Sequence, residues 1–360
     1  MKIVVAMSGG VDSAVAAALL AEAGHDVIGL SMQLYDQTLG EDRFGSCCSI
    51  DDLHDARRAA HAIGIPHYLL NFEREFDAQV VAPFVAEYAA GRTPIPCTRC
   101  NTDVKFATLA ARAAALGAER VATGHYAQVS QVPDTGRWRL RRSVDPSKDQ
   151  TYFLFGLTQD QLSVASFPVG HLTKAAVRDI ARARALPVAD KPDSQEICFV
   201  PGGDYAAFVE RRLDDAPAAG PILDQDGHTV GHHGGVHRFT VGQRKGLGIP
   251  AEPDGRPRYV LALRPAEQAI VVGPRDALAQ QTLEASAVNW IEPMPSAARR
   301  VTAQIRHRHP PAAASVEALP DGRARVTFDD PQPAITPGQA VVFYDDDVVV
   351  GGGWIDATGR

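Results

Sequence analysis

The feature that most constrains this chain is a short polar turn that directly follows a buried strand within residues 1–32. Residues 3–6 form a continuous apolar run, which is typical of a strand buried on both faces of a parallel sheet. A helix follows, with apolar side chains at positions 11, 15, 18 and 19 on one face and Gly24 at its end. The apolar pattern of residues 27–30 then predicts a second strand. The pattern predicts a βαβ unit, and therefore an α/β domain with a parallel sheet.

The turn between the first strand and the helix has the composition of a phosphate-binding loop. Gly9 and Gly10 lack a Cβ, so their backbone can bend sharply and approach a ligand closely. Backbone N–H groups at the start of the next helix favour an anion, and Ser8 and Ser13 add hydroxyl donors. The sequence therefore predicts a site for phosphate or pyrophosphate; the alternative is an ordinary capped helix start. We interpret Asp12 as a helix cap, a Mg²⁺ partner, or both.

Length and composition limit the possible functions. The 360 residues exceed one ordinary domain and predict two or three. The 36 basic and 43 acidic residues give a formal net charge of −7, so any nucleic-acid surface has to be local. No apolar run approaches the roughly 20 residues that cross a bilayer, and no secretory leader is evident, so we expect a cytoplasmic protein without a membrane partner. Five cysteines in such a chain argue against a disulfide framework.

The rest of the chain alternates between helical and strand patterns up to about residue 203. Asn101 is expected to cap a helix, and Pro133 to Gly136 mark the turn of a hairpin across 126–142. From about residue 282 short strands alternate with Pro/Gly turns, which favours a small β-barrel or sandwich. The expected helices are 50–63, 102–116, 172–186 and 205–212. The expected domains are a catalytic α/β domain at 1–202, a central domain at 203–276 and a C-terminal β-barrel at 277–360.

The cysteines are candidates for reactivity or metal binding. Cys100 directly precedes the expected helix start, where the pKa of a thiol falls, and Cys198 ends a polar segment. The alternative for each is a small buried hydrophobe. Cys97 and Cys100 together with Cys47 and Cys48 also offer four thiolates to zinc or an iron–sulfur cluster, although two adjacent cysteines give poor tetrahedral geometry. We therefore predict no metal site.

Six motifs occur in register along the chain. They are S-G-G-V-D-S at 8–13, T-P-x-P-x-x-x-C-N at 93–101, T-G-H-Y-A at 123–127, K-D-Q-T-Y-F at 148–153, D-S-Q-E-I-C-F-V at 193–200 and V-G-Q-R-K-G-L-G at 241–248. The first resembles the PP-loop of N-type ATP pyrophosphatases, which have a Rossmann-like HUP fold. Together the six resemble the bacterial tRNA-specific 2-thiouridylase family over essentially the whole chain.

The resemblance implies a chemistry and its site residues. ATP, bound with Mg²⁺, would adenylate the C2 oxygen of the wobble uridine in tRNA, with release of pyrophosphate and then AMP. Cys198 would carry a persulfide supplied by a donor protein, either a cysteine desulfurase or a sulfur relay protein. Cys100 would be the nucleophile that releases this sulfur, and the two cysteines would end as a disulfide. The implied ATP-site residues are Ala6, Met7, Ser8, Gly9, Gly10, Val11, Asp12, Ser13, Met32 and Gly124. The implied tRNA-contacting residues are Ile95, Pro96, Cys97, His125, Lys148, Asp149, Gln150, Arg306, His307 and Gln339.

One departure from the family pattern affects the base-contacting loop. The family often has Asn-Pro-Asp where this chain has Ile95, Pro96 and Cys97. How these side chains would hold the target base is therefore open. The change also places a second thiol three residues from Cys100, so Cys97 competes for the role of resolving thiol.

Two basic windows predict electrostatic tRNA binding in an acidic protein. Nine cations stand against Asp145 alone within 137–148 and 299–308, and phosphate contacts of this kind weaken steeply with salt. The cations are Arg137, Arg139, Arg141, Arg142, Lys148, Arg299, Arg300, Arg306 and Arg308.

Two other functions compete with thiolation. An ATP pyrophosphatase that transfers nitrogen would need no paired cysteines. A nucleotide-binding module without catalysis, resembling electron-transfer flavoproteins or stress proteins, would need neither Cys198 nor a barrel.

Overall fold

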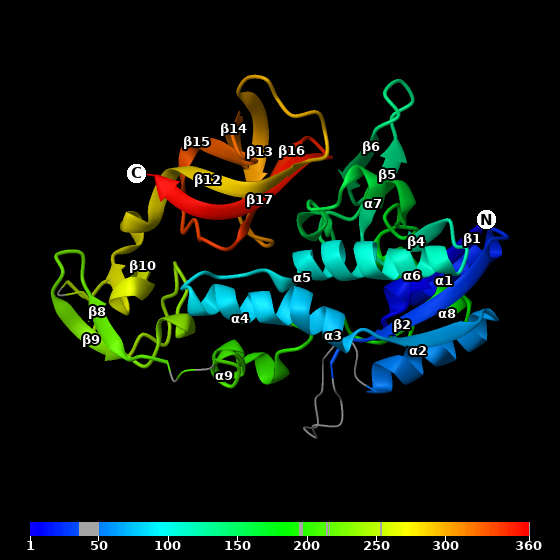
Figure 1. The fold of residues 1–360 in the computed structure, drawn as a ribbon, viewed down its shortest axis with the longest axis horizontal. Helices are drawn as coiled ribbons and strands as arrows, with labels where there is room; N and C mark the ends of the chain where they lie inside the picture. The colour runs from blue at the N-terminus through cyan, green and yellow to red at the C-terminus, as the bar shows by residue number, and fades with distance from the viewer. Residues whose placement is uncertain (36–49, 194–196, 214, 216, 253, 360) are drawn as a thin grey trace. The chain divides into compact units, whose positions relative to one another are not determined.

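The computed structural model describes residues 1–35, 50–193, 197–213, 215, 217–252 and 254–359 (Figure 1). Contacts between Cα atoms divide the chain into two compact units. Unit 1 comprises Met1–Val81, Pro96–Gly203 and Asp347–Val349. Unit 2 comprises Ala82–Ile95, Asp204–Asp346 and Val350–Arg360.

Unit 1 contains a parallel sheet with the strand order β3-β2-β1-β4-β7. The chain adds β2 and β3 on one side of β1, and then β4 and β7 on the other side. The direction of winding therefore changes between β1 and β4, which confirms the expected α/β class. The strands are β1 (Lys2–Ala6), β2 (Asp26–Gln33), β3 (His67–Asn71), β4 (Arg120–Ala122) and β7 (Ala165–Ser166).

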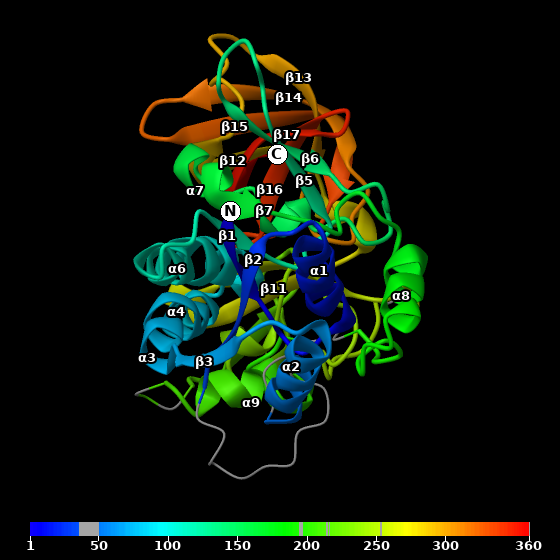
Figure 2. The same cartoon turned by 90° about the vertical axis from the view of Figure 1, so that its right-hand side faces the viewer.

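Helices cover both faces of this sheet (Figure 2). Three of them, α1 (Val11–Glu22), α2 (Ile50–Ile63) and α8 (Lys174–Ala183), share one apolar core with β1 and β2. Ala16, Ala17, Ala56, Ala59 and Ala60 are all buried there, and such small side chains let the helices lie close to the sheet. On the other side lies α6 (Ala110–Ala115), which continues α5 (Pro96–Arg99) through the wider helical turns of Cys100–Leu109.

The helix expected at 102–116 begins at Pro96 instead. Proline fits the first helical turn because its missing N–H would have no partner there. Asn101 therefore lies inside the helix, where its Nδ2 donates to the Phe153 carbonyl (3.1 Å) and its Oδ1 accepts from Lys105 Nζ (2.9 Å). The expectation that Asn101 caps the helix is wrong, because tertiary partners occupy its side chain.

Unit 1 also contains a β-hairpin and several short helical segments. The hairpin predicted across 126–142 is confirmed, with Gln131 opposite Trp138 at the turn. Thr158 and Gln161 form a reciprocal capping box at the start of α7. These elements are α3 (Glu73–Phe76), which continues into the wider turn Asp77–Val81, β5 (Ala127–Gln131), β6 (Trp138–Arg142), Thr151–Phe153, α7 (Gln159–Val164) and Pro201–Gly203.

Unit 2 begins with a small mixed sheet in the order β10-β11-β8-β9. Ile222, Val260 and Ile270 are buried in its core. Beside it, Tyr88 stacks on Tyr205 with ring centroids 4.7 Å apart. The elements are α4 (Ala82–Ala89), α9 (Tyr205–Glu210), β8 (Gly220–Leu223), β9 (Thr229–His233), Val236–Arg238, β10 (Tyr259–Arg264), Pro265–Glu267, β11 (Ala269–Gly273) and Arg275–Leu278.

The C-terminal part of unit 2 is a closed six-stranded β-barrel. Its strand order is β12-β15-β14-β13-β16-β17, and β17 pairs back with β12. Closure leaves no unpaired sheet edge around a core that includes Phe328 and Phe343. This confirms the expected barrel. The strands are β12 (Ala279–Trp290), β13 (Arg299–Gln304), β14 (Ala312–Leu319), β15 (Arg323–Pro333), β16 (Ala340–Asp345) and β17 (Val348–Gly359).

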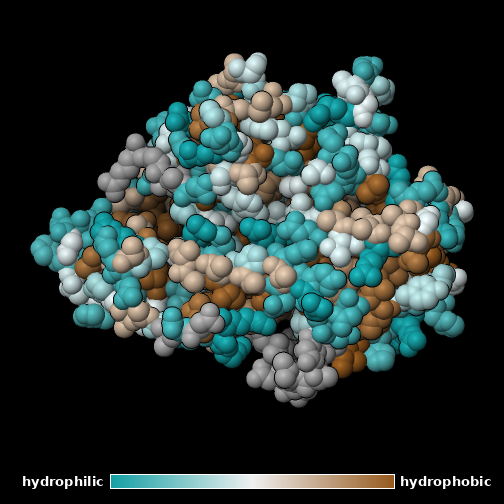
Figure 3. Space-filling view, in the orientation of Figure 1, coloured by the Kyte–Doolittle hydropathy of each residue, from teal (hydrophilic) through white to brown (hydrophobic). Residues whose placement is uncertain are grey.

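The described surface carries apolar patches among polar side chains (Figure 3). On the face shown, one patch lies where Figure 1 places β2 and α2. Leu69 on β3 and Ile50 on α2 are 49% and 56% exposed. Within the described residues, no helix has both the length and the apolar composition needed to cross a membrane.

Gly220 is predicted to be essential for the central sheet of unit 2. A Cβ at this position would overlap the carbonyl oxygen of Gln268, which accepts a hydrogen bond from His233 Nε2 (3.1 Å). His233 Nδ1 accepts from the Gly235 N–H, so Nε2 carries the proton. Gly220→Ala should lower the free energy of unfolding by about 1–3 kcal/mol, measured by chemical denaturation. Gly234→Ala is the control, because nothing lies within 4 Å of its added Cβ; equal stability of the two variants would contradict the prediction.

Candidate functional site

The loop between β1 and α1 requires glycine at its tightest point. Gly9 has a φ of +75°, and a Cβ there would overlap the carbonyl oxygen of Asp52 at the start of α2. Gly10 is the N-cap of α1 with an extended backbone, and no side chain caps this helix. The first N–H groups of α1 are therefore directed at the loop without a capping side chain. This is the arrangement in which a helix N-terminus binds an anion.

The serines of the loop stabilise its shape. The Ser8 N–H donates to Ser13 Oγ (3.3 Å), and Ser13 Oγ donates to the Gly10 carbonyl (3.1 Å). Ser13 is buried and Ser8 is exposed. Of the two hydroxyls expected to contact a ligand, only that of Ser8 is exposed.

The loop lies where the winding of the sheet reverses. In open parallel sheets ligands bind at the carboxyl ends of the strands beside such a reversal. Gly124 follows β4, the neighbour of β1, and a Cβ on it would lie 2.5 Å from the Ser13 nitrogen. Met32 lies near the end of β2 on the other side of β1 and is buried. The structure thus brings the expected ATP-site residues of 6–13 and Gly124 together at one edge.

Asp12 does not cap the helix. It lies within α1, one residue beyond the first helical position, and its carboxylate accepts from Tyr126 Oη (2.8 Å) and from Lys174 Nζ (2.8 and 2.9 Å to its two oxygens). The cap interpretation is wrong because Gly10 takes the N-cap position. Burial, and then the Asp12 carboxylate, raise the pKa of Tyr126 well above its usual value, so Tyr126 stays protonated and donates.

Lys174 links the loop to the segment that leads to Cys198. Its ammonium also lies 2.7 Å from Asp193 Oδ1, and Lys148 Nζ lies 2.7 Å from Asp193 Oδ2. Burial opposes ionisation of Asp193, but hydrogen bonds from Lys148 and Lys174 prevail and lower its pKa. The sequence places Lys174 only within the helix expected at 172–186. Its role was missed because the carboxylates it joins lie far from it in sequence.

The two cysteines expected to act together have different surroundings. Cys100 is buried within the helix that begins at Pro96, whereas Cys97 is exposed in its first turn and Cys198 is partly exposed. The expectation that Cys100 precedes a helix start in a loop is wrong. Since the helix dipole acts mainly within the first turn, it favours the thiolate of Cys97 more than that of Cys100. Cys47 and Cys48 lie outside the described residues.

Comparisons with known proteins cover nearly the whole chain. The model of a tRNA methyl transferase HUP domain matches residues 1–202, that of a tRNA methyl transferase PRC-barrel domain matches 206–274, and that of an aminomethyltransferase β-barrel domain matches 280–355. A tRNA-specific 2-thiouridylase MnmA from Geotalea uraniireducens is 52% identical over 99% of this chain and 95% of its own length. The chain belongs to the tRNA-specific 2-thiouridylase family.

A second relative agrees with this membership. The 2-thiouridylase MnmA of Koribacter versatilis is 51% identical over 98% of each chain. A solved 4-thiouridine synthetase–RNA complex with bound ATP aligns with a TM-score of 0.34 at 13% identity, over 59% of this chain and 50% of that one. That structural likeness is too weak to support an inference.

The positions that match the 2-thiouridylase pattern for tRNA contact lie in both units. Unit 1 holds Pro96, Cys97, His125, Lys148, Asp149 and Gln150, and unit 2 holds Ile95, Arg306, His307 and Gln339.

Three of these side chains serve the fold directly. Asp149 accepts from Arg142 (2.9 Å), Gln150 Oε1 accepts from the Tyr126 N–H (2.9 Å), and Gln339 Nε2 donates to the Thr93 carbonyl (2.8 Å).

His125 is a neutral member of the 2-thiouridylase motif at 123–127. Burial, assisted by the charge of Lys105, lowers the pKa of His125 well below its usual value. Its Nδ1 lies 2.6 Å from Thr123 Oγ1, and its ring packs edge-on against Phe167. The imidazole is therefore neutral and does not supply a cation for a phosphate.

The two basic windows are largely neutralised by carboxylates from elsewhere in the chain. At least five of the nine cations form ion pairs, so the count against Asp145 alone misjudged the local charge. The pairs are Arg141–Asp347, Arg142–Asp149, Lys148–Asp193, Arg299–Asp345 and Arg300–Asp329. Exposed pairs of this kind leave little net field for a polyanion.

Lys174→Met should destabilise unit 1 because it leaves Asp12 and Asp193 as neighbouring carboxylates without their shared cation. We expect a loss of about 1–3 kcal/mol in the free energy of unfolding at pH 7. A carboxyl group whose pKa is lowered by folding stabilises the protein at pH values above its pKa in the unfolded chain, which is near 4. This contribution disappears as the pH falls through the pKa of the folded state. The difference from wild type should therefore shrink in acid.

Chemical denaturation at pH 7 and at pH 3 tests this prediction. Lys2→Met is the matched control, since the ammonium of Lys2 lies 3.9 Å from the exposed Asp26. A loss for Lys174→Met no larger than that for Lys2→Met would show that the bridge contributes nothing.

Proposed function

We propose that this chain is a cytoplasmic enzyme that thiolates C2 of the wobble uridine in tRNA, using ATP and a persulfide sulfur. The observation that carries the proposal is the glycine loop between β1 and α1 at the sheet reversal, whose Asp12 is linked through Lys174 to Asp193. Membership in the 2-thiouridylase family supports the substrate class. Sulfur would come from a donor protein, a cysteine desulfurase or a relay protein.

The proposed first step uses the loop. The uridine C2 oxygen attacks the α-phosphorus of ATP, the bond to pyrophosphate breaks, and the oxygen becomes part of an AMP leaving group. The N-terminal N–H groups of α1 fit a bound polyphosphate. Gly9 and Gly124 let the backbone of Asp52 and of the α1 N-terminus pack closely around the loop. The Lys174 ammonium adds a positive charge next to the loop.

Mg²⁺ is proposed to accompany the phosphates. It would neutralise the charge that develops on the leaving pyrophosphate. Asp12 is the carboxylate of the loop suited to hold it, and Lys174 and Tyr126 now occupy both of its oxygens with hydrogen bonds. These three bonds leave one lone-pair position of the carboxylate, on Oδ2, so a metal ion held there would lie close to the Lys174 ammonium.

The proposed second step uses the two cysteines. The terminal sulfur of a Cys198 persulfide attacks C2, and AMP leaves with the former C2 oxygen. The Cys100 thiolate then attacks the sulfur of Cys198, so that the S–S bond to the uridine breaks and a Cys100–Cys198 disulfide forms. A thiol reductant resets the pair. Since a disulfide needs Cα atoms within about 7 Å, the buried Cys100 has to meet Cys198 within that distance.

Other reactions leave features of the site without a role. Nitrogen transfer and simple nucleotide binding give no role to Cys100 and Cys198. Methyl transfer, which the descriptions of two matching domain models name, needs no polyphosphate loop. ATP-dependent entry of radiolabelled sulfur into tRNA separates thiolation from all three.

Asp12→Ala should abolish tRNA-dependent pyrophosphate release. The change removes the partner of Lys174 and Tyr126 at the loop and the only carboxylate within 8–13. Pyrophosphate is measured with a coupled enzyme at saturating ATP and tRNA. Asp26→Ala, which removes an exposed carboxylate on β2, should leave the rate unchanged. Wild-type release by Asp12→Ala would exclude its carboxylate from the mechanism.

Cys198→Ser should lose both the persulfide and all thiolation. After loading by a desulfurase, intact-mass analysis should find one added sulfur on wild type and on Cys100→Ser, but none on Cys198→Ser. Cys100→Ser should fail to complete transfer, as judged by nucleoside mass spectrometry of the tRNA. Cys47→Ser and Cys48→Ser should keep activity within a few-fold.

Cys97→Ser decides which thiol resolves the persulfide. Cys97 is exposed and lies in the first helical turn, so its accessibility competes with the family match of Cys100. We expect Cys97→Ser to stay active. An inactive Cys97→Ser together with an active Cys100→Ser would transfer the resolving role to Cys97.

A further inference from the structure

We propose that Arg244, Arg275 and Arg306 form a binding pocket for one backbone phosphate of the RNA substrate. The pocket lies within unit 2 and has a volume of about 330 Å³. Its lining contains three arginines and no acidic residue; the other lining residues are Gly242, Tyr259, Leu278, Pro333 and Ala334. The proposal rests on the proposed function, because it names where the tRNA backbone would be held.

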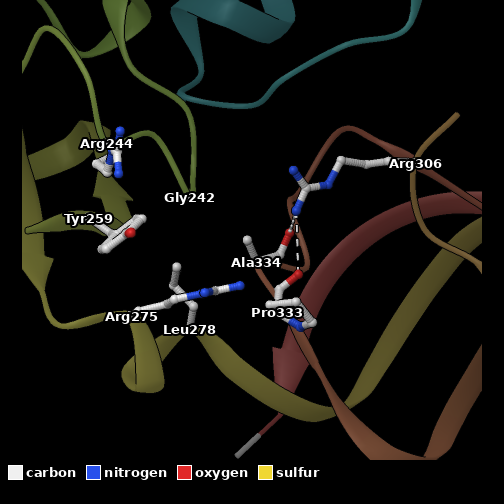
Figure 4. A pocket seen from close by; sticks show the side chains of 8 residues that line it. All are labelled: Gly242, Arg244, Tyr259, Arg275, Leu278, Arg306, Pro333 and Ala334. Atoms are coloured by element: carbon white, nitrogen blue, oxygen red, sulfur yellow. Dashed lines mark hydrogen bonds between the residues drawn. The ribbon is translucent and has the colours of Figure 1, made fainter. Parts of the chain in front are cut away.

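The three guanidinium groups come from three separate segments. Arg244 follows Gly242 in the loop before β10, Arg275 begins the short helical turn after β11, and Arg306 follows β13 of the barrel. Figure 4 shows Arg275 and Arg306 extending toward the space between them from opposite sides, with Arg244 beside Tyr259. Cations directed at one space from several segments repel one another, and a bound anion would relieve this repulsion.

The absence of counterions distinguishes Arg244 and Arg275 from most arginines of unit 2. Within the described residues, neither forms an ion pair or a hydrogen bond with another side chain or with a backbone carbonyl. By contrast, Arg256, Arg258, Arg264, Arg299 and Arg300 all pair with carboxylates. Arg244 and Arg275 are also exposed, so their charges are available to a polyanion.

Backbone and side-chain hydrogen bonds fix the loop that carries Arg244. The Gly242 N–H donates to the Val260 carbonyl (2.8 Å), and the Val260 N–H donates to the Gln243 carbonyl (3.0 Å). Gln243 Oε1 accepts from the Thr240 N–H (3.1 Å), and its Nε2 donates to the Lys245 carbonyl (3.0 Å). The backbone on both sides of Arg244 is thus held before any ligand binds.

Gly242 packs against Ala334, and Arg306 is held on the opposite wall. Gly242 has a φ of +87°, and a Cβ on it would lie 2.7 Å from the Cβ of Ala334. Arg306 Nη2 donates to the carbonyl oxygens of Ala334 (2.8 Å) and Pro333 (3.3 Å) (Figure 4). These bonds hold the guanidinium at the mouth of the pocket. Arg306 was expected to contact tRNA, whereas Arg244 and Arg275 were not singled out from the sequence.

The surroundings of the pocket favour a phosphate within a chain over a free anion. Two of the three arginines are exposed, and His307 and Arg308 continue the exposed polar surface next to Arg306. A phosphodiester could therefore enter while the chain on either side remains in solvent. Phosphate contacts position nucleic acid without reading its sequence, so this pocket would set the register of tRNA on unit 2.

Binding of tRNA as a function of salt tests the proposal. Arg244→Gln and Arg275→Gln should each weaken tRNA binding by roughly tenfold. Each should lower the slope of log Kd against log salt concentration by about 1, and the double variant should lower this slope by about 2. The KM for tRNA should rise in thiolation assays, while kcat at saturating tRNA and the KM for ATP stay at wild-type values. Arg264→Gln, which removes an exposed arginine paired with Glu267, should leave the slope unchanged.

Three results would overturn the proposal, and each has a different meaning. A wild-type slope in the double variant would exclude the pocket and leave the proposed function intact. Calorimetry could instead show that inorganic phosphate or pyrophosphate binds wild type but not the double variant. If the two proteins also had equal salt slopes for tRNA binding, the pocket would be a small-anion site. Wild-type protein that neither binds nor thiolates tRNA would refute the proposed function and the pocket together.

Discussion

The geometry of the candidate site depends on one ammonium group held between two carboxylates. Lys174 reaches Asp12 in the loop after β1 and Asp193 in the segment before Cys198, from the first turn of a helix that Thr173 caps. This cation is hard to replace, because its removal leaves two partly buried carboxylates side by side without the charge they share. The loop after β1 is therefore tied to Asp193.

In the proposed reaction, this bridge would also connect nucleotide binding with the cysteine chemistry. Polyphosphate at the α1 N-terminus would attract the Lys174 ammonium, and a cation at Asp12 would displace it. Either event changes the balance of contacts at Asp193, which Lys148 and Arg178 then share. In the proposed reaction, competition for this one cation would give a physical reason for sulfur delivery to follow nucleotide binding.

The sequence predicted those features whose causes are local. The apolar run at 3–6, the glycines at 9 and 10 and the hairpin turn at 133–136 each specify their structure within a few residues, and the sheet, loop and hairpin formed as expected. The prediction that Asn101 caps a helix failed, because its side chain bonds to partners such as Phe153 that only the fold brings near. Lys174 was missed and the basic windows were misjudged for the same reason, since ion pairing depends on residues that are distant in sequence.

The pairing of charges also explains how an acidic protein can recognise a polyanion. Most arginines of the barrel and the central sheet are matched by a carboxylate, as Arg299 is by Asp345 and Arg300 by Asp329. Such pairs limit nonspecific attraction, because RNA would have to compete with an existing partner and with salt. Attraction then concentrates where cations lack carboxylates, as at Arg244 and Arg275. A few cations without a carboxylate partner define the docking position of a phosphate more sharply than a uniformly basic surface would. A net charge of −7 is therefore compatible with specific RNA binding.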